Sequence, residues 1–290
     1  MIAGGPPAST RPARGSKIFG EGRGALISAT STIAFFALLA AAIAMAPGSR
    51  EVARDFFSWT AMREAFVGTA TTPSIGSAFL LNVRIFLIAE VLILILAMVI
   101  AVVRAMPGPV FAPLRLVAVI YTDFFRGVPL LLVIYIVGFG IPGLAIEGVS
   151  DRSPVILGGA ALVLSYSAYV AEVYRAGIDS VHESQVAAAR SLGLSRWQSL
   201  RFVVLPQAVR RVIPPLLNDF ISLQKDTALV AVLGPIEAAR AAAIYGSDRF
   251  NYSSFVVAAL LFILLTIPLA RFTDRLIARD QRRRRAGSMA

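Results

Sequence analysis

The sequence has no cysteine, one histidine (His182) and only two lysines (Lys17 and Lys225) in 290 residues. Without cysteine there are no disulfides, cysteine-rich zinc sites or thiol catalysis, and one histidine argues against a histidine metal site. Neither lysine lies in the GxxxxGK[ST] pattern of a phosphate-binding loop, and the GxSxG and HExxH patterns are absent. We therefore predict that the chain is not an enzyme and binds no metal or cofactor itself.

Charged residues are also scarce. They make up 16% of the chain, against 57% hydrophobic residues and a mean hydropathy of +0.74, whereas a soluble domain has about 25% charged residues. The net charge of +11 could suit nucleic acid, but the arginines fall between apolar runs and in the tail. The composition predicts an all-α membrane protein that contacts membrane lipid and no nucleic acid.

Six apolar runs are long enough to cross about 30 Å of hydrocarbon. We predict six transmembrane helices, at about residues 25–46, 80–103, 113–137, 155–174, 212–233 and 253–272. The stretch before them, 1–24, is rich in Gly, Pro, Ser and Arg, which predicts a disordered leader. A cleaved signal peptide is the alternative, although the first run is longer than a usual signal core.

The segments between the runs differ in arginine content, and this predicts the orientation. Segment 47–78 mixes charges with aromatic residues and is either an interfacial helix or a surface loop. If this segment and two other loops lie outside the membrane, they hold six Lys and Arg together, whereas the segments on the inner side hold 19. Because such an excess marks cytoplasmic loops, we expect both termini, including the basic tail 276–290, to be cytoplasmic.

A polar stretch between the fourth and fifth runs, 182–206, is the most distinctive in the chain. Its alanine run would let another surface approach closely, and Gly193 suits the left-handed position that ends a helix. Ser195 then fits the N-cap of a second helix, with Gln198 as its capping-box partner. Leu205-Pro206 closes the stretch, where Pro206 either stops that second helix or starts the following one. These features predict two short helices at a bend, either a docking surface or an amphipathic elbow lying on the membrane.

The sequence from 169 to 215 closely resembles the cytoplasmic loop of ATP-binding-cassette (ABC) importer permeases, above all those for polar amino acids. The signature of that family is Glu-Ala-Ala, then a glycine, then Leu-Pro, and the chain matches it at Ala188-Ala189, Gly193 and Leu205-Pro206. Further matches are Tyr169, Glu172, Arg175, Gly177, Ile178, Gln207, Pro214, Pro215, Arg126 to Leu131 and Lys225 to Leu229. The resemblance covers roughly residues 75–275.

This resemblance implies a type I ABC importer permease fold, with a five-helix core in 79–275 and one extra helix in front. It implies a coupling loop, 175–211, that docks on ATPase subunits. The implied partners are two ABC ATPase subunits, which use ATP-Mg, a second permease copy or sister permease, and an extracytoplasmic solute-binding protein. The implied location is the bacterial plasma (inner) membrane, and the residues implied to contact the ATPase are Glu183, Gln185, Ala187, Ala188, Ala189, Leu192, Gly193, Leu205 and Pro206.

One position departs from the family pattern. Ala187 stands where the signature has its glutamate, which removes a carboxylate from the expected ATPase contact. Glu183 lies four residues earlier and therefore on the same face of a helix. We hypothesise that Glu183 takes over the missing contact.

Charged residues within the apolar runs form a second set of candidates. Each costs about 2.5–3.5 kcal/mol at the centre of a membrane helix, so we do not expect them to face lipid. Asp123 and Arg126 are spaced to pair on one helix face, and Pro129 predicts a hinge or a kink. The alternatives are pairing between helices and a role in the translocation pathway, and both apply to Glu90, Asp123, Arg126, Lys225 and Asp226.

The function implied is a permease subunit of an ATP-driven importer of polar amino acids. Two other classes remain as alternatives on the sequence alone. An ion-coupled secondary transporter would show internal repeats, which are not visible here. A non-transporting membrane subunit would not need the polar stretch at 182–206.

Overall fold

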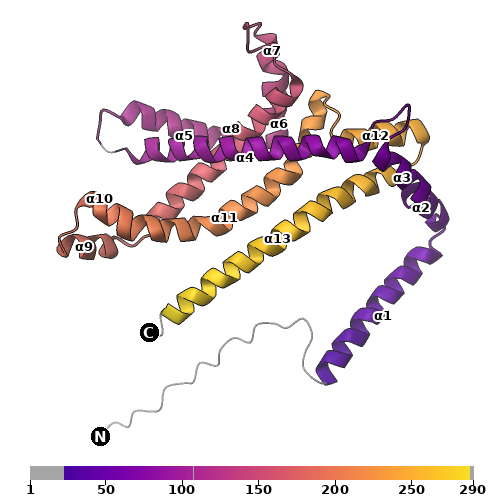
Figure 1. Cartoon of the computed structure of the whole chain (residues 1–290), viewed down its shortest axis with the longest axis horizontal. Coiled ribbons are helices and arrows are strands. Elements are labelled where there is room, and N and C mark those ends of the chain that lie inside the picture. The colour runs from indigo at the N-terminus through magenta and orange to yellow at the C-terminus, as the bar shows by residue number, and fades with distance from the viewer. Residues whose placement is uncertain (1–22, 107, 288–290) are drawn as a thin grey trace. The chain divides into compact units, whose positions relative to one another are not determined.

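The computed structural model describes residues 23–106 and 108–287, and the elements in these ranges are helical. Most of the predicted leader therefore lies outside the described residues. The chain divides into two compact units, Met1–Arg54 and Asp55–Ala290 (Figure 1). The helix α2, Ser49–Phe56, crosses the boundary between them.

The first unit contains α1, Arg23–Met45, which coincides with the first predicted span within about two residues. Leu26–Met45 is long and apolar enough to cross a membrane. Its hydroxyl groups are satisfied within the helix: Thr30 and Thr32 donate to the carbonyls of Leu26 and Ser28 at 2.6 and 2.7 Å. Such local bonds let hydroxyl side chains lie in hydrocarbon without orphaned donors.

The second unit begins with α3, Trp59–Val67, which is capped by Ser58. Segment 47–78 is thus largely helical. The later elements, in chain order, are α4 (Ile75–Ala105), α5 (Ala112–Gly127), α6 (Leu130–Tyr135), η1 (Ile136–Gly140), α7 (Ile141–Gly143), α8 (Pro154–Asp179), α9 (Glu183–Ser191), α10 (Arg196–Ser199), η2 (Leu200–Val204), α11 (Leu205–Asp226), η3 (Thr227–Leu233), α12 (Ala238–Arg249) and α13 (Ser253–Gly287).

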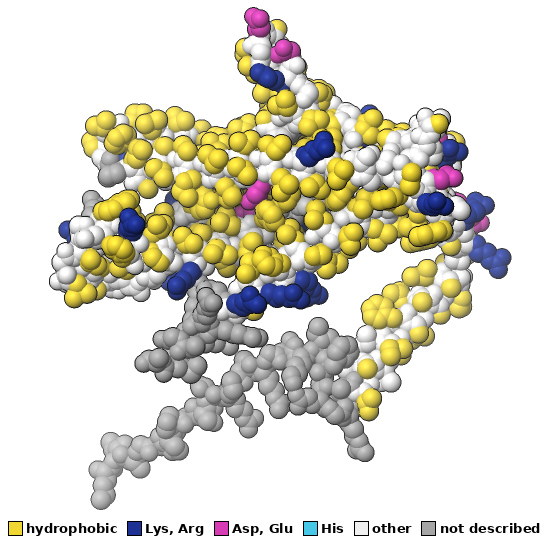
Figure 2. Space-filling view, viewed as in Figure 1, with side chains coloured by type: hydrophobic (Ala, Val, Ile, Leu, Met, Phe, Trp, Pro, Cys, Tyr) yellow, Lys and Arg dark blue, Asp and Glu magenta, His cyan; other side chains and the backbone are white. Residues whose placement is uncertain are grey.

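In the described chain, four single helices qualify as membrane spans, α1, α4, α8 and α13, and six spans result if two bent helix pairs each cross once. Hydrophobic side chains cover most of the face of the second unit in Figure 2. The sixth prediction was too short, because α13 continues past 272 to Gly287. The all-α, multi-pass membrane architecture is confirmed.

The third predicted span, 113–137, is wrong as a continuous helix. It breaks at Val128, which has an extended backbone (φ −97°, ψ 130°), and α5 and the 130–143 helix diverge by 110°. Pro129 explains the break, because proline disfavours helical geometry in the preceding residue and lacks an N–H to donate.

The fifth predicted span was also drawn too short. Its helical path runs from Trp197 to Leu233, ends at Gly234 (φ 105°) and resumes in α12 after a 53° bend. The supposed outer loop 236–252 is therefore mostly helix. Ala241 and Tyr245 of α12 are buried against α3, α4 and α13, in a second, smaller core.

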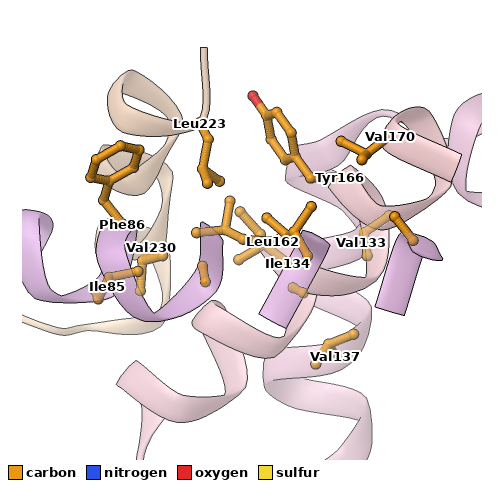
Figure 3. Packing of buried hydrophobic residues seen from close by; sticks show 14 of the residues in the cluster. Ile85, Phe86, Val133, Ile134, Val137, Leu162, Tyr166, Val170, Leu223 and Val230 are labelled. Carbon is orange, nitrogen blue, oxygen red and sulfur yellow. The ribbon is translucent and has the colours of Figure 1, made fainter. Parts of the chain in front are cut away.

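The main core lies where α8 contacts α4, α5, α6 and α11. Figure 3 shows Leu162 of α8 among side chains from these neighbours, with Ile134 of α6 and Leu223 of α11 close by. Glycine permits the closest approach: a Cβ on Gly177 of α8 would overlap the side chain of Val212 of α11. The α8–α11 pair therefore forms a tightly packed base for the segment that follows α8.

Candidate functional site

Residues 182–206, which we call the elbow, form two helices at a bend, as predicted, but only the first is short, because the second continues into a membrane helix. The first, α9, begins at His182, whose Nδ1 accepts from the backbone N–H of Ser184 at 3.2 Å. It ends at Gly193, which has φ +85°. The N–H of Leu194 then donates to the Ala189 carbonyl at 3.2 Å, a bond typical of a glycine-terminated helix end.

The second helix starts with the predicted capping box. The backbone N–H of Ser195 donates to Gln198 Oε1 at 2.8 Å, and the N–H of Gln198 donates to Ser195 Oγ at 3.2 Å. Both bonds satisfy donors that a helix start otherwise leaves unpaired. The end of α9 and the start of the second helix are both held by local hydrogen bonds. The shape of the elbow is therefore set by its own sequence.

Pro206 does not stop the second helix, and the alternative, that it starts the following one, is nearer: α11 begins at Leu205 with Pro206 in its first turn. The helix runs from α10 through Pro206 into α11 by way of η2, a π-helical turn. The N–H of Leu205 donates to the carbonyl of Leu200, five residues back, and this wider turn accommodates a proline that has no N–H. The elbow is therefore joined to a membrane helix without a break.

A side-chain bond braces the elbow against this helix. Gln207 Nε2 donates to Gln185 Oε1 at 2.5 Å and to the Val203 carbonyl at 3.0 Å. Gln185 thus joins α9 to α11 within the chain itself. The brace ties the first helix of the elbow to the membrane helix that follows.

The outer surface of the elbow carries small and large apolar side chains among polar ones. Ala187 and Ala188 are exposed, whereas Ala189 is only 5% exposed and packs inward. Leu192 is 83% exposed and Trp197 is 67% exposed, so the elbow presents two large apolar side chains on its surface. The elbow lies at one end of the second unit in Figure 1. We call Leu192 and Trp197 the tip of the elbow, and their exposed apolar side chains are typical of a docking surface.

A charged cluster lies on α8 close to the elbow, and its centre is Glu172. Arg104 of α4 donates to Glu172 Oε1, and Arg126 of α5 lies 3.8 Å from the same atom. Arg175 donates twice to Glu172 Oε2, at 2.8 and 3.0 Å. Glu172 and Arg104 are largely buried, so the cluster joins three helices where water is scarce.

This arrangement corrects the proposed pairing of Asp123 with Arg126. Within the described residues, no ion pair joins those two side chains, and Arg126 turns to Glu172 instead. The side chain of Asp123 is exposed on α5. The three-residue spacing allowed the pair, but a neighbouring helix offered a better partner.

A polar cavity of about 530 Å³ opens beside the cluster, between α5, α8 and α11. Its lining includes two cations, Arg126 and Arg211, and two carboxylates, Glu172 and Asp219. Asp219 Oδ2 is buried and has no hydrogen-bond partner in the described part of the chain. The cavity therefore combines both charge signs with an unused acceptor.

The other intramembrane candidates lie apart from one another. Glu90 is half-buried in α4, near enough to Asp219 for the two carboxyl groups to interact. Lys225 is exposed, and Asp226 accepts from the hydroxyl of Tyr166 at 2.6 Å. Arg126 thus lines the cavity, whereas Glu90 is not part of its lining and Lys225 and Asp226 lie at the end of α11.

A buried polar network was missed by the sequence analysis. Asn82 of α4 donates to Glu237 Oε2 at 3.0 Å and to Thr227 Oγ1 at 3.2 Å, and its Oδ1 accepts from the N–H of Ala238. Glu237 also accepts from the backbone N–H groups of Ala239 and Arg240, at 2.9 and 2.7 Å. A glutamate just before an alanine-rich run was the available signal, because an acidic residue favours a helix start.

Comparison with known proteins shows the family that the chain matches. Residues 95–283 match the model of the family described as "Binding-protein-dependent transport system inner membrane component". The chain is 36% identical over 184 residues to the probable glutamine ABC transporter permease protein GlnM of Bacillus subtilis, covering 61% of this chain and 79% of that protein. It is 31% identical over 210 residues to the probable amino-acid permease protein YxeN of the same organism, covering 72% and 89%.

Solved structures give the same picture. A chain of an amino acid ABC transporter crystallised with histidines matches with a TM-score of 0.65 and 29% identity, over 71% of this chain and 93% of that one. A chain of the MetNI methionine ABC transporter, in an inward-facing conformation, matches with a TM-score of 0.57 over 71% and 95%. At 16% identity, the second likeness shows the fold alone.

Proposed function

The chain belongs to the family of binding-protein-dependent transport system inner membrane components and is a permease subunit of an ABC importer, and on this premise we propose that it carries polar amino acids. The proposal extends to its partners: two ATPase subunits that use ATP-Mg, a second permease and an extracytoplasmic solute-binding protein. The relatives named for glutamine and amino-acid transport support this cargo. They favour it over an ion-coupled transporter or a non-transporting subunit.

The elbow carries the coupling part of the proposal. A flexible loop could not transmit force. In this elbow, the end of α9 and the start of the second helix are both capped, and the second helix continues into α11. Leu192 and Trp197 offer exposed apolar area at its tip, and buried aromatic and aliphatic anchors dominate binding energy at interfaces. We infer that this tip enters a cleft on the ATPase, so that closure of the ATPase dimer moves α11.

The polar cavity supports an amino-acid cargo. A zwitterion needs a cation for its carboxylate and an acceptor for its ammonium group. Arg126 and Arg211 provide the first, and Asp219, with its unpaired oxygen, provides the second. We propose that the cavity is part of the path on the side of the elbow.

The orientation follows from the same argument. ATP is available in the cytosol, so an elbow that binds the ATPase faces the cytoplasm. An even number of spans then returns the basic tail to that side. The Lys and Arg excess in the segments on the elbow side agrees with this placement.

Purification tests the class and the cargo together. We expect a tagged full chain, expressed with its neighbouring genes, to co-elute with a P-loop ATPase. In vesicles with the solute-binding protein, ATP should drive uptake of labelled glutamine or histidine well above that of a sugar. Uptake that persists without any ATPase would contradict the proposal, and ATP-driven uptake restricted to a non-amino-acid solute would contradict its cargo.

The replacement of the family glutamate by Ala187 gives a second prediction. Glu183 is exposed one turn earlier on α9, so Glu183→Gln should weaken ATPase binding by about three- to tenfold, the effect of one ordinary hydrogen bond at a partly wet interface. Binding is measured by titrating the purified ATPase. The matched control is Glu147→Gln, an exposed glutamate far from the elbow. Unchanged ATPase binding by Glu183→Gln would show that Glu183 does not make the contact that the family glutamate would make at Ala187.

A further inference from the structure

One arginine in a membrane span has no role in the cluster or the cavity. Arg84 is exposed on α4, and no hydrogen bond or ion pair to it is found among the described residues. The other arginine of α4, Arg104, is bound to Glu172. A charged side chain in a membrane helix is costly unless it finds a partner, so Arg84 needs one from outside the second unit.

The surroundings of Arg84 are those of a lipid-facing surface. Residues on the same side of α4 are large, apolar and exposed, including Leu80, Leu87, Ile88 and Val91. They recur every three or four residues, which makes a continuous stripe along the helix. Figure 2 likewise shows isolated basic side chains standing in a hydrophobic surface. Arg84 therefore places one positive charge within a stripe of apolar side chains. This is the position expected of an arginine at the level of the lipid headgroups.

An apolar groove runs beside Arg84, between α4 and α8, with a volume of about 540 Å³. Leu81, Ile88 and Leu92 form one wall, Ile156 and Val163 the other, and Arg84 is the one charged residue of this lining. From 81 to 92 the groove follows α4 for about 16 Å, at 1.5 Å per residue. That length is close to one leaflet of a bilayer whose hydrocarbon core is about 30 Å thick.

The direction of the arginine side chain fits the same geometry. Arg84 lies nine residues from the start of α4 at Ile75, about 14 Å along the axis. Helical side chains lean toward the N-terminus, so the guanidinium group extends toward the nearer membrane interface. Its charged end then reaches headgroup level while the methylene stem stays in hydrocarbon.

We propose that Arg84 and this groove form a binding site for an anionic phospholipid. The guanidinium group holds the headgroup phosphate with paired N–H donors, and one acyl chain lies in the groove. A helix of another protein would need an acidic residue inside the bilayer to match Arg84, whereas an anionic lipid brings its charge at the depth that Arg84 reaches. The proposal does not depend on the cargo.

The test is a lipid titration of the full chain, purified in detergent with its co-eluting subunits and observed by native mass spectrometry. Phosphatidylglycerol is compared with phosphatidylcholine of the same acyl chains. Arg84→Gln should weaken binding of the first phosphatidylglycerol molecule by about tenfold, the effect of a lost charge-assisted contact. Arg84→Lys should weaken it by less. Gly159→Leu should weaken binding of both lipids, because Gly159 lines the groove with open space above it.

Arg271→Gln is the matched control, since Arg271 is exposed on α13 and lies outside the groove lining. It should bind phosphatidylglycerol like the unmodified chain. The proposal is overturned if Arg84→Gln binds as well as the unmodified chain, or if Arg271→Gln loses as much. It is also overturned if Gly159→Leu leaves lipid binding unchanged but releases the second permease, since the groove would then be a protein interface.

Discussion

Replacing Leu192 with aspartate is expected to detach the ATPase from this permease. Leu192 stands at the tip of the elbow and is 83% exposed, so the change should leave the fold of the chain intact. A carboxylate placed in an apolar cleft loses its hydration without a partner. Because hot-spot residues contribute about 2 kcal/mol or more, ATPase affinity should fall at least about 30-fold, and ATP-driven uptake should be lost.

Affinity is measured by titrating the ATPase against the permease in detergent, and the fold is checked by gel filtration. Phe250→Asp is the matched control: Phe250 is 82% exposed and follows α12, a helix at the opposite end of the second unit from α9 and α10 in Figure 1. Its left-handed backbone (φ 50°) tolerates aspartate. If Leu192→Asp still binds and couples normally, the tip of the elbow is not the docking surface.

Replacing Glu237 with alanine should give the largest loss of stability. Glu237 has no exposed surface and accepts hydrogen bonds from Asn82, Ala239 and Arg240. Alanine would leave three donors unpaired in a core that water does not reach, at about 1 kcal/mol or more for each. We therefore expect the free energy of unfolding to fall by about 3 kcal/mol, because α12 loses its N-cap and one of its two hydrogen bonds to Asn82 of α4 together.

The measurement is a denaturant titration in mixed micelles, followed by helix content. Glu237→Gln keeps one acceptor oxygen and should lose only part of that stability. Glu147→Ala is the control on an exposed glutamate, where a surface change is within about 0.5 kcal/mol of neutral. A Glu237→Ala protein as stable as Glu147→Ala would show that the network contributes little.

The features that sequence predicted well are local ones. Gly193, Ser195 and Gln198 interact within a few residues, so their chemistry can be recognised without the rest of the chain. The apolar runs likewise mark the four spans that are single helices, α1, α4, α8 and α13, because length and hydropathy are properties of one segment by itself.

The missed features depend on distant residues or on how proline is accommodated. Asn82 and Glu237 are 155 residues apart, and nothing near either one reveals the other. Pro129 marked a break, but the angle of 110° depends on where α6 packs. Pro206 is compatible with the end of one helix or the start of the next, and the π turn that joins the two helices could not be predicted from it.

The π turn at η2 also fixes which face the elbow presents. It winds one extra residue into an otherwise continuous rod that joins α10 to α11. Successive residues in a helix are rotated by about 100°, so one residue more or less in 200–204 would swing the tip by that amount around the rod. The core, on the other side of the turn, would be unchanged. The rotational phase between the tip of the elbow and the membrane helices is thus set by a count of residues, so that chain length in this turn, rather than side-chain identity, determines which way the tip faces.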